Sequence, residues 1–242
     1  MKIGIVSDIH SNLAAFQAVL RTLEDENCLK IVCAGDIVGY GPSPAQCLEI
    51  IREKRIPCVR GNHDHMMCSD SRLARLRPHV REAVLWSREQ LTAEDRQWLA
   101  GLPRVLQYAG FELVHSSHVL RPEWHYVIDR RSAAANFLFQ TSSICFNGHS
   151  HVPLLALHRD GSRPRLVELG NIKLPRGYRF LINVGSVGQP RDRNPMAACA
   201  TFETREKEVR LLRVRYDVED TQKKIRKAGL PEHLAARLEA GR

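Results

Sequence analysis

The sequence predicts an α/β fold with a parallel sheet near the N-terminus and a second sheet formed by the later part of the chain. In the first 62 residues, apolar β-branched segments alternate with segments whose apolar residues recur at helical spacing, which is the pattern of β-α-β units. After residue 111, short strand-like segments follow one another with turns between them, which indicates the second sheet. A chain of 242 residues is long enough to bury a substantial core as one domain.

The first half of the chain is expected to begin in the order strand, helix, strand, helix, strand. Strands are predicted at residues 2–8, 30–36 and 56–62, because each is apolar and closes on polar residues. Residues 12–27 and 45–54 carry apolar side chains at helical spacing, as in Leu13, Phe16, Val19, Leu20 and Leu23. Two consecutive crossovers of this kind imply that the three strands are parallel.

The second half is expected to contain a helical pair, several strands and a helical tail. Residues 72–100 show helical spacing interrupted near Thr92, which with Asp95 resembles a helix N-cap. Strands are predicted at 111–117, 143–151, 152–158, 164–169, 179–186, 197–203 and 208–217. Two short helices follow, one ending at Gly229 and one beginning with Pro231. We therefore expect one domain over 1–242, with a helical insertion at about 65–103 and a helical tail at about 217–242.

Composition indicates a cytoplasmic protein that does not enter a membrane. The sequence has no apolar run of about 18 residues, and its N-terminus does not resemble a signal peptide. Its seven cysteines include no C-x-x-C pair, so neither a disulfide framework nor a zinc knuckle is expected. The formal charge of +9 favours an Arg-rich solvated surface over a nucleic-acid interface, because no basic-aromatic pattern accompanies it. Nucleic acid is thus an optional partner, and the oligomeric state is left open.

Polar side chains cluster where five of the expected strands end. Parallel strands align their C-terminal ends, so we expect these side chains to meet at one rim. Buried together, carboxylates and imidazoles would be costly unless cations lay among them. Carboxylate, imidazole and amide donors without thiolate suit Mn²⁺, Fe, Zn²⁺ or Ni²⁺, and their number predicts a two-metal site. The candidate residues are Asp8, His10, Asp36, Asn62, His63, Asp64, His115, His149 and His151.

The order of these motifs resembles the calcineurin-like metallophosphoesterases. The motifs are D-x-H at 8–10, G-D at 35–36, G-N-H-D at 61–64, H at 115 and G-H-S-H at 148–151, and the resemblance extends from residue 3 to about 190. It implies a four-layer α/β/β/α sandwich of two mixed sheets flanked by helices, with a dinuclear metal site between the edges of the two sheets.

The same resemblance implies a role for each site residue. One metal ion would be held by Asp8, His10, Asp36 and His151, and the other by Asp36, Asn62, His115 and His149. Asp36 would then bridge the two ions, and His63 would face the substrate.

Two departures from the family pattern narrow the expectation. The protein phosphatases of this superfamily extend the second motif to G-D-x-x-D-R-G, but here Gly39 and Tyr40 occupy the positions of the second Asp and the Arg. The missing Arg would have clamped a terminal phosphate, so the chain resembles instead the small bacterial and archaeal phosphodiesterase-like branch, as it also does at 183–192. The second departure is "HSSH" at 115–118: relatives usually have Gly after the metal-binding His, where this chain has Ser116. Ser116 leaves the ligand in place, but His118 competes with His115 for that role. We favour His115 because it lies at the strand end.

We therefore expect a hydrolase that cleaves phosphodiester bonds of a small phosphorylated or nucleotide-like substrate. A hydroxide bridging the metal ions would attack phosphorus, with manganese the favoured metal. His63 and Asp64 are the candidate catalytic residues. Asn62, His63 and Arg191 are the candidate substrate-binding residues, although the turn that carries Arg191 is explained equally well as a tight connection between strands.

Several alternatives stay open at this point. Within the same enzyme class, a phosphomonoesterase or a dinucleoside polyphosphate hydrolase would use the same metal ligands. A non-catalytic scaffold of the same fold is less favoured, because such proteins lose metal ligands or the catalytic His, and all are present here. Tyr40 and the segment 121–126, "RPEWHY", offer aromatic side chains that either stack on a base or belong to the core.

Overall fold

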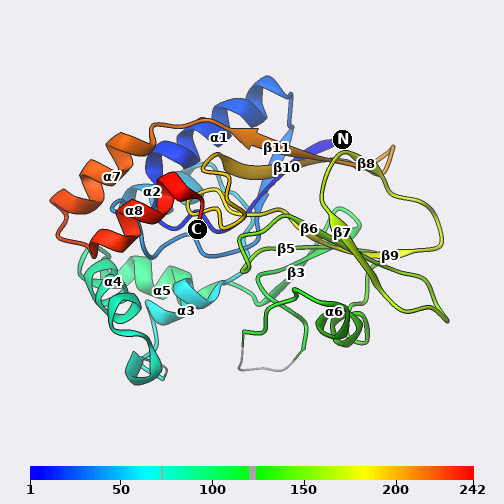
Figure 1. Ribbon diagram of the computed structural model, residues 1–242, viewed down its shortest axis with the longest axis horizontal. Helices are drawn as coiled ribbons and strands as arrows, with labels where there is room; N and C mark the ends of the chain where they lie inside the picture. Colours follow the sequence, from blue (N-terminus) through cyan, green and yellow to red (C-terminus); the bar gives the residue numbers. More distant parts are fainter. Residues whose placement is uncertain (72, 120–123) are drawn as a thin grey trace.

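Two mixed β-sheets face each other in the centre of the molecule, as the computed structural model shows for residues 1–71, 73–119 and 124–242 (Figure 1). Sheet A has the order β2-β1-β10-β11-β8, and sheet B has the order β3-β4-β5-β9-β6-β7. The strands of sheet A are β1 (Lys2–Val6), β2 (Lys30–Cys33), β8 (Ile172–Lys173), β10 (Ala197–Glu203) and β11 (Glu208–Val214). Those of sheet B are β3 (Val105–Tyr108), β4 (Phe111–Val114), β5 (Ile144–Asn147), β6 (Leu154–His158), β7 (Arg165–Glu168) and β9 (Arg179–Asn183).

Helices cover the outer faces of both sheets. They are α1 (Leu13–Asp25), α2 (Pro44–Glu53), α3 (Asn62–Met66), α4 (Pro78–Glu89), α5 (Ala93–Gly101), α6 (Arg130–Phe137), α7 (Val218–Lys227) and α8 (Glu232–Ala240), with a short 3₁₀ turn at Leu73–Arg75. Helix α1 packs on β10 and β11 of sheet A. Helix α6 lies on the other side of the molecule and packs on sheet B through Ala133 and Phe137 (Figure 1). The predicted four-layer sandwich is therefore confirmed.

The core between the sheets is apolar and aromatic. Sheet A contributes Ile5, Val32 and Phe202, and sheet B contributes Phe111 and Phe146, all fully buried. The three phenylalanine rings contact each other edge to face with centroids 5.1–5.6 Å apart. Each ring buries a large apolar area, and such ring contacts add about 0.5–1.5 kcal/mol per pair beyond that burial. This core fixes the two sheets, and therefore the strand ends that carry the polar residues, relative to each other.

Most predicted elements are present, with one clear difference. β1 and β2 are parallel, as expected. Residues 56–62, predicted as a third parallel strand, form only a single bridge between Cys33 and Cys58 before α3 begins. Val59 donates its backbone N–H to Cys33 of β2, but the next N–H on that side, that of Gly61, donates to Oδ2 of Asp64, so the ladder ends there. Strands β3 and β8 were not predicted.

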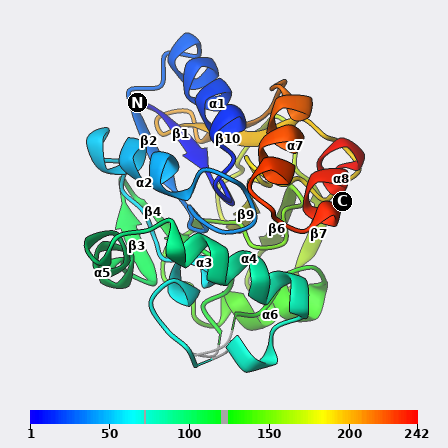
Figure 2. The ribbon, with the colours of Figure 1, turned by 90° about the vertical axis from the view of Figure 1, so that its left-hand side faces the viewer.

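The helical insertion and the tail pack against each other. Helices α4 and α5 form the predicted pair, and Thr92 caps α5 with Asp95 in a reciprocal capping box. Leu234 and Leu238 of α8 and Ile225 of α7 form an apolar cluster with Ala83 of α4, against which Tyr40 packs. Figure 2 shows α7 and α8 side by side, with α4 below them. Among the described residues, no helix combines the length and apolarity needed to cross a membrane.

Candidate metal centre

The predicted site residues come together where strands of both sheets end. Asp8 and His10 follow β1, Asp36 follows β2, and His115 follows β4, whereas His149 and His151 follow β5 and Asn62 begins α3. The donors lie between two sheets, as the family resemblance implied, and not at the rim of a single parallel sheet, because β1 and β2 belong to sheet A and β4 and β5 to sheet B. The carboxylates and imidazoles are at most 6 % exposed. Asn62 is partly exposed.

A first group of donors consists of Asp8, His10 and His151. The Nε2 atom of His151 lies 3.2 Å from Oδ1 of Asp8 and 3.1 Å from Nε2 of His10. The three side chains come from loops after β1 and β5 and are close enough to bind one ion together.

A second group consists of Asp36, His115 and His149, with Asn62 beside it. The Nε2 atom of His115 lies 3.2 Å from Oδ2 of Asp36 and 3.1 Å from Oδ1 of Asn62. Oδ2 of Asp36 is also 3.6 Å from Nε2 of His10 in the first group. Asp36 therefore lies between the two groups.

Backbone carbonyls fix the orientation of three imidazoles. The Nδ1 atoms of His10, His115 and His151 lie 3.2, 2.8 and 2.6 Å from carbonyl oxygens of Val38, Ala34 and Gln189. A carbonyl can only accept, so each Nδ1 carries a proton, and in the neutral ring the Nε2 lone pair points at the carboxylates. This is how proteins orient histidines that bind a metal through Nε2.

The protonation behaviour of these rings fits a cation site. Burial lowers the pKa of His10 and of His151, so both rings are neutral and their facing Nε2 lone pairs repel. Burial also acts to lower the pKa of His115, but the Asp36 and Asp8 carboxylates and the Ala34 carbonyl together outweigh it and raise that pKa to about 10. The carboxylates thus attract positive charge into a pocket of nitrogen and oxygen donors. The donor set fits divalent or trivalent metal ions of the kind the sequence indicated.

His149 is held differently from the other three histidines. Its Nε2 donates to the carbonyl oxygen of Trp124 over 3.3 Å, which leaves Nδ1 as the donor atom for an ion. Tyr126 stacks on its ring at 4.1 Å with an interplanar angle of 10°. Burial, followed by the charge of His115, lowers the pKa of His149 to about 3. This ring is therefore neutral, as a metal ligand must be.

His63 lies beside the metal ligands. Its backbone N–H donates to Oδ1 of Asp36 over 2.8 Å, and its ring packs between those of His10 and Tyr40, 4.8 and 4.3 Å away. Burial lowers its pKa to about 4. Its Nδ1 atom is buried and has no hydrogen-bond partner among the described residues.

Asp64 holds the loops that carry the donors. Its carboxylate accepts hydrogen bonds of 2.9 Å from the backbone N–H groups of Asp36, Ile37 and Gly61, and a longer one of 3.3 Å from Val38. Burial and the nearby Asp36 charge raise the pKa of Asp64 to about 7. The backbone hydrogen bonds act in the opposite direction but do not cancel this rise. The contacts of Asp64 are thus to backbone, and its side chain ties the loop after β2 to the start of α3.

His118 lies apart from the two donor groups. Its Nε2 atom is 2.9 Å from Oε2 of Glu112, and these two side chains group with Cys145 on the side of sheet B that faces α6. His115, and not His118, is therefore the residue that the structure places beside Asp36.

Aromatic and basic side chains surround the donors. The guanidinium of Arg191 lies 5.9 Å from the centroid of Tyr40 and donates from Nη2 to Oε1 of Gln189 over 2.9 Å. The segment "RPEWHY" is described only from Trp124 onward, because 121–123 lie outside the described residues. Within it, the Tyr126 ring and the Trp124 carbonyl contact His149, a predicted metal ligand. Sequence reasoning did not assign these contacts, because any residue can supply a backbone carbonyl.

The loops of the site adopt an unusual backbone conformation. Asp8, His10, Asp36, Tyr40, His149 and His151 all have φ between 46° and 71°, in the left-handed region that non-glycine residues seldom adopt. Such strain persists only when the surrounding structure enforces it, and it concentrates at functional sites.

Comparison with known proteins identifies the family. A family model described as the calcineurin-like phosphoesterase superfamily domain matches residues 1–207. The chain belongs to this superfamily. It is a metallophosphoesterase, a metal-dependent hydrolase of phosphoric esters, and it carries candidate metal-binding residues at the positions described above.

Relatives cover the whole length of the chain. It is 35% identical to an uncharacterized protein of Methanocaldococcus jannaschii, over 99% of this chain and 98% of that protein. A crystal structure of a metallophosphoesterase from Sphaerobacter thermophilus is 39% identical, with a TM-score of 0.85 over 100% of this chain and 99% of that one. A hypothetical protein from Pyrococcus horikoshii OT3 is 21% identical and shares the fold, with a TM-score of 0.81 over 100% and 98%. Helices α7 and α8 follow the residues that the family model matches.

Proposed function

We propose that the protein is a dinuclear metal-dependent phosphodiesterase acting on a nucleotide-like substrate. The observation that carries this proposal is the position of Asp36, whose Oδ2 is 3.2 Å from His115 Nε2 and 3.6 Å from His10 Nε2. One ion would bind to Asp8, His10, Asp36 and His151, and the other to Asp36, Asn62, His115 and His149. A carboxylate shared by two groups of imidazoles is the ligand arrangement of two-metal hydrolases.

The metal ions and the protein side chains have separate tasks. When bound, the two ions, for which we propose manganese, with iron, zinc or nickel as alternatives, supply Lewis acidity and a water of lowered pKa as the nucleophile. Asn62 is partly exposed beside His115 and can also donate a hydrogen bond to a non-bridging phosphate oxygen. Arg191 supplies a fixed positive charge near the same phosphate.

His63 is the candidate general acid. Its ring is neutral in the free protein, and its buried Nδ1 has no hydrogen-bond partner in the described parts of the chain, so the ring is available to a substrate. An anionic phosphate close to the ring raises the pKa of the imidazole and favours its protonated form. His63 would then protonate the departing oxygen of the substrate.

A preference for diesters is supported by Tyr40. Tyr40 occupies the position where protein phosphatases of the superfamily carry an Arg that binds a terminal phosphate, and its ring packs against His63. A phosphate monoester carries up to two negative charges, and without that guanidinium the second charge has no partner. A phosphate diester carries only one negative charge, so the missing guanidinium disfavours it less.

The proposal is tested with purified protein reconstituted with Mn²⁺. We expect two ions per chain and a higher kcat/KM for bis(4-nitrophenyl) phosphate than for 4-nitrophenyl phosphate. A monoester preference of about tenfold or more, about 1.4 kcal/mol in transition-state stabilisation, would contradict the diesterase assignment. Two bound ions with hydrolysis of neither ester, across Mn²⁺, Ni²⁺, Zn²⁺ and Mg²⁺, would indicate the non-catalytic scaffold.

A further inference from the structure

A third group of possible metal ligands lies on the face of sheet B that α6 covers. Glu112 of β4 and Cys145 of β5 are register partners on neighbouring strands, so their side chains lie side by side on this face. The ligand atoms of these two residues and of His118 all lie within 4.8 Å of one another. The surrounding layer is apolar and includes Val114 and Phe137. Polar donors gathered in such a layer need partners.

Glu112 satisfies only one of its two carboxylate oxygens. Its Oε1 accepts hydrogen bonds from Nε2 of Gln107, from the backbone N–H groups of Thr141 and Ser142, and from the Thr141 hydroxyl. Its Oε2 is buried and has no hydrogen-bond partner among the described residues, and the residue as a whole is 1 % exposed. A buried carboxylate oxygen without a donor is costly, so a cation bound there would stabilise it.

The imidazole of His118 is oriented as in histidines that bind a metal through Nε2. Its Nδ1 lies 3.2 Å from Oδ1 of Asn136 on α6, and the Asn136 amide nitrogen donates to Gln140, so Oδ1 is the acceptor. Nδ1 therefore carries the proton, and Nε2 of the neutral ring has a lone pair.

The free atoms of His118 and Glu112 face each other. Nε2 of His118 lies 2.9 Å from Oε2 of Glu112, and the His118 side chain is 7 % exposed. The orientation of the two groups is not that of a hydrogen bond, and each atom is without a hydrogen-bond partner in the described parts of the chain. A lone pair this close to a carboxylate oxygen requires a second proton on the ring or a metal ion. Cys145 provides a third donor, which a metal ion would use and a protonated ring would not.

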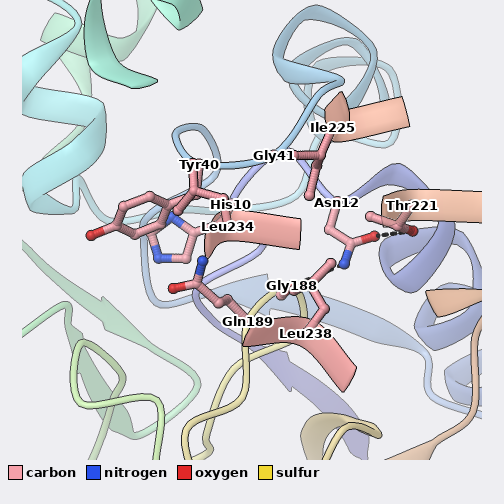
Figure 3. Close-up of a pocket in the computed structure, with 10 residues that line it drawn as sticks. All are labelled: His10, Asn12, Tyr40, Gly41, Gly188, Gln189, Thr221, Ile225, Leu234 and Leu238. Carbon is pink, nitrogen blue, oxygen red and sulfur yellow. Dashed lines mark hydrogen bonds between the residues drawn. The ribbon is translucent and has the colours of Figure 1, made fainter. Parts of the chain in front are cut away.

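This group is separate from the dinuclear centre described above. A small cavity of about 10 Å³ at that centre is lined by His10 and Tyr40 together with Leu234 of α8, and the third group lines no part of it (Figure 3). Glu112 and Cys145 come three and four residues before His115 and His149. Strands β4 and β5 therefore carry one group of donors after their ends and another on the face toward α6.

We propose that Glu112, His118 and Cys145 bind a structural zinc ion. Thiolate sulfur, imidazole nitrogen and carboxylate oxygen are all ordinary zinc ligands, and a water molecule would complete a tetrahedral set. On binding, the Cys145 thiol loses its proton to solvent and the sulfur forms a bond to the ion. The ion would join β4 and β5 to the segment after β4, and through Asn136 to α6. This inference does not depend on the proposed phosphodiesterase function.

A cobalt titration of the full-length, metal-free chain tests the proposal, with Co²⁺ as a spectroscopic substitute for zinc. A bond between Co²⁺ and a thiolate gives a charge-transfer band in the near ultraviolet, and none of the donors assigned to the dinuclear centre is a thiolate. We expect this band in the wild type, and we expect excess Zn²⁺ to abolish it. Absence of the band, or a band that Zn²⁺ does not abolish, would overturn the proposal.

Variants locate the band. Cys145→Ser should remove it, and Glu112→Gln should raise the Co²⁺ concentration at half-maximal absorbance by at least about tenfold, because a ligand is lost. Cys47→Ser is the matched control, because Cys47 is also fully buried but lies on α2, and it should keep the band. Asp36→Asn changes the dinuclear centre and should keep it as well. Persistence of the band in Cys145→Ser, or its loss in either control variant that thermal unfolding shows to be folded, would overturn the proposal.

Zinc content gives a second measurement. After saturation with Zn²⁺ and removal of the excess, the wild type should hold one ion more per chain than Cys145→Ser. Equal zinc content in the two proteins would mean that His118 and Glu112 form an ion pair only, which would overturn the proposal. Hydrolysis of a diester enters neither measurement, so failure of this inference and failure of the proposed function are distinguishable.

Discussion

At the scale of single residues, the metal centre depends on which atom of each imidazole carries the proton. The sequence predicted the histidines because they follow strands in recognisable motifs. It could not predict their Nδ1 partners, which are backbone carbonyls such as those of Val38 and Gln189, because every residue has a carbonyl. It also grouped Asp64 with the catalytic residues. The four backbone N–H groups around its carboxylate lead us to propose a positioning role instead.

Asn62 and His63 are adjacent in sequence but should differ in function. Asn62→Ala should lower the metal content, because the Asn62 Oδ1 next to His115 is lost. His63→Asn should keep both ions and lose rate. If His63 acts as a general acid, the loss should be mild for a nitrophenolate leaving group and about 10²–10⁴-fold for an alkoxide leaving group. Metal analysis and kcat/KM with both kinds of diester measure this.

The outcomes separate the two roles. An equal loss on both diesters in His63→Asn would leave His63 with charge stabilisation alone. Loss of metal in that variant would make His63 a ligand and would contradict the assignment.

At the scale of elements, the site is formed by the turns that follow strands rather than by the strands themselves. Alternation and apolar runs predicted where β1, β2, β4 and β5 lie, because burial in a sheet requires them. These patterns could not predict that residues 56–62 would leave the sheet, since the segment is as apolar as a strand. They also could not predict the left-handed backbone of Asp8, Asp36 and His151, because that conformation is imposed by the contacts of the folded loops.

The turn after β5 gives the element-scale prediction. A Cβ at Gly148 would overlap Ser7 Oγ and Asp8 Oδ2, so the turn that carries His149 can approach β1 only with glycine. Gly148→Ala should therefore displace Asp8 and lower metal affinity by about 10–100-fold, the usual cost of disturbing groups that orient ligands. Gly101→Ala is the control, because nothing lies within 4 Å of a Cβ there. Metal titration of both variants checks this, and wild-type affinity in Gly148→Ala would contradict the close packing.

At the scale of the whole molecule, the helical insertion and the helical tail meet beside the metal centre. The sequence predicted both segments from their helical spacing and end signals. It did not predict that α4, α7 and α8 pack together against Tyr40, because an amphipathic face indicates burial without naming its partner. The folded chain thus places residues beyond 207, outside the family-matched part, next to loops from its first 41 residues.

Leu234 provides a test of this arrangement, because it is fully buried between the tail, the insertion and Tyr40. Leu234→Ala should lower the free energy of unfolding by about 2–5 kcal/mol, because the substitution removes buried apolar area and leaves an empty space in the core. It should also lower kcat/KM, because Leu234 lines the cavity that His10 and Tyr40 share. Leu29→Ala, at an exposed leucine, should change the free energy of unfolding by no more than about 0.5 kcal/mol. Denaturant unfolding and steady-state kinetics measure both effects. A stability loss with unchanged kcat/KM would show that the tail stabilises the fold without supporting the metal centre.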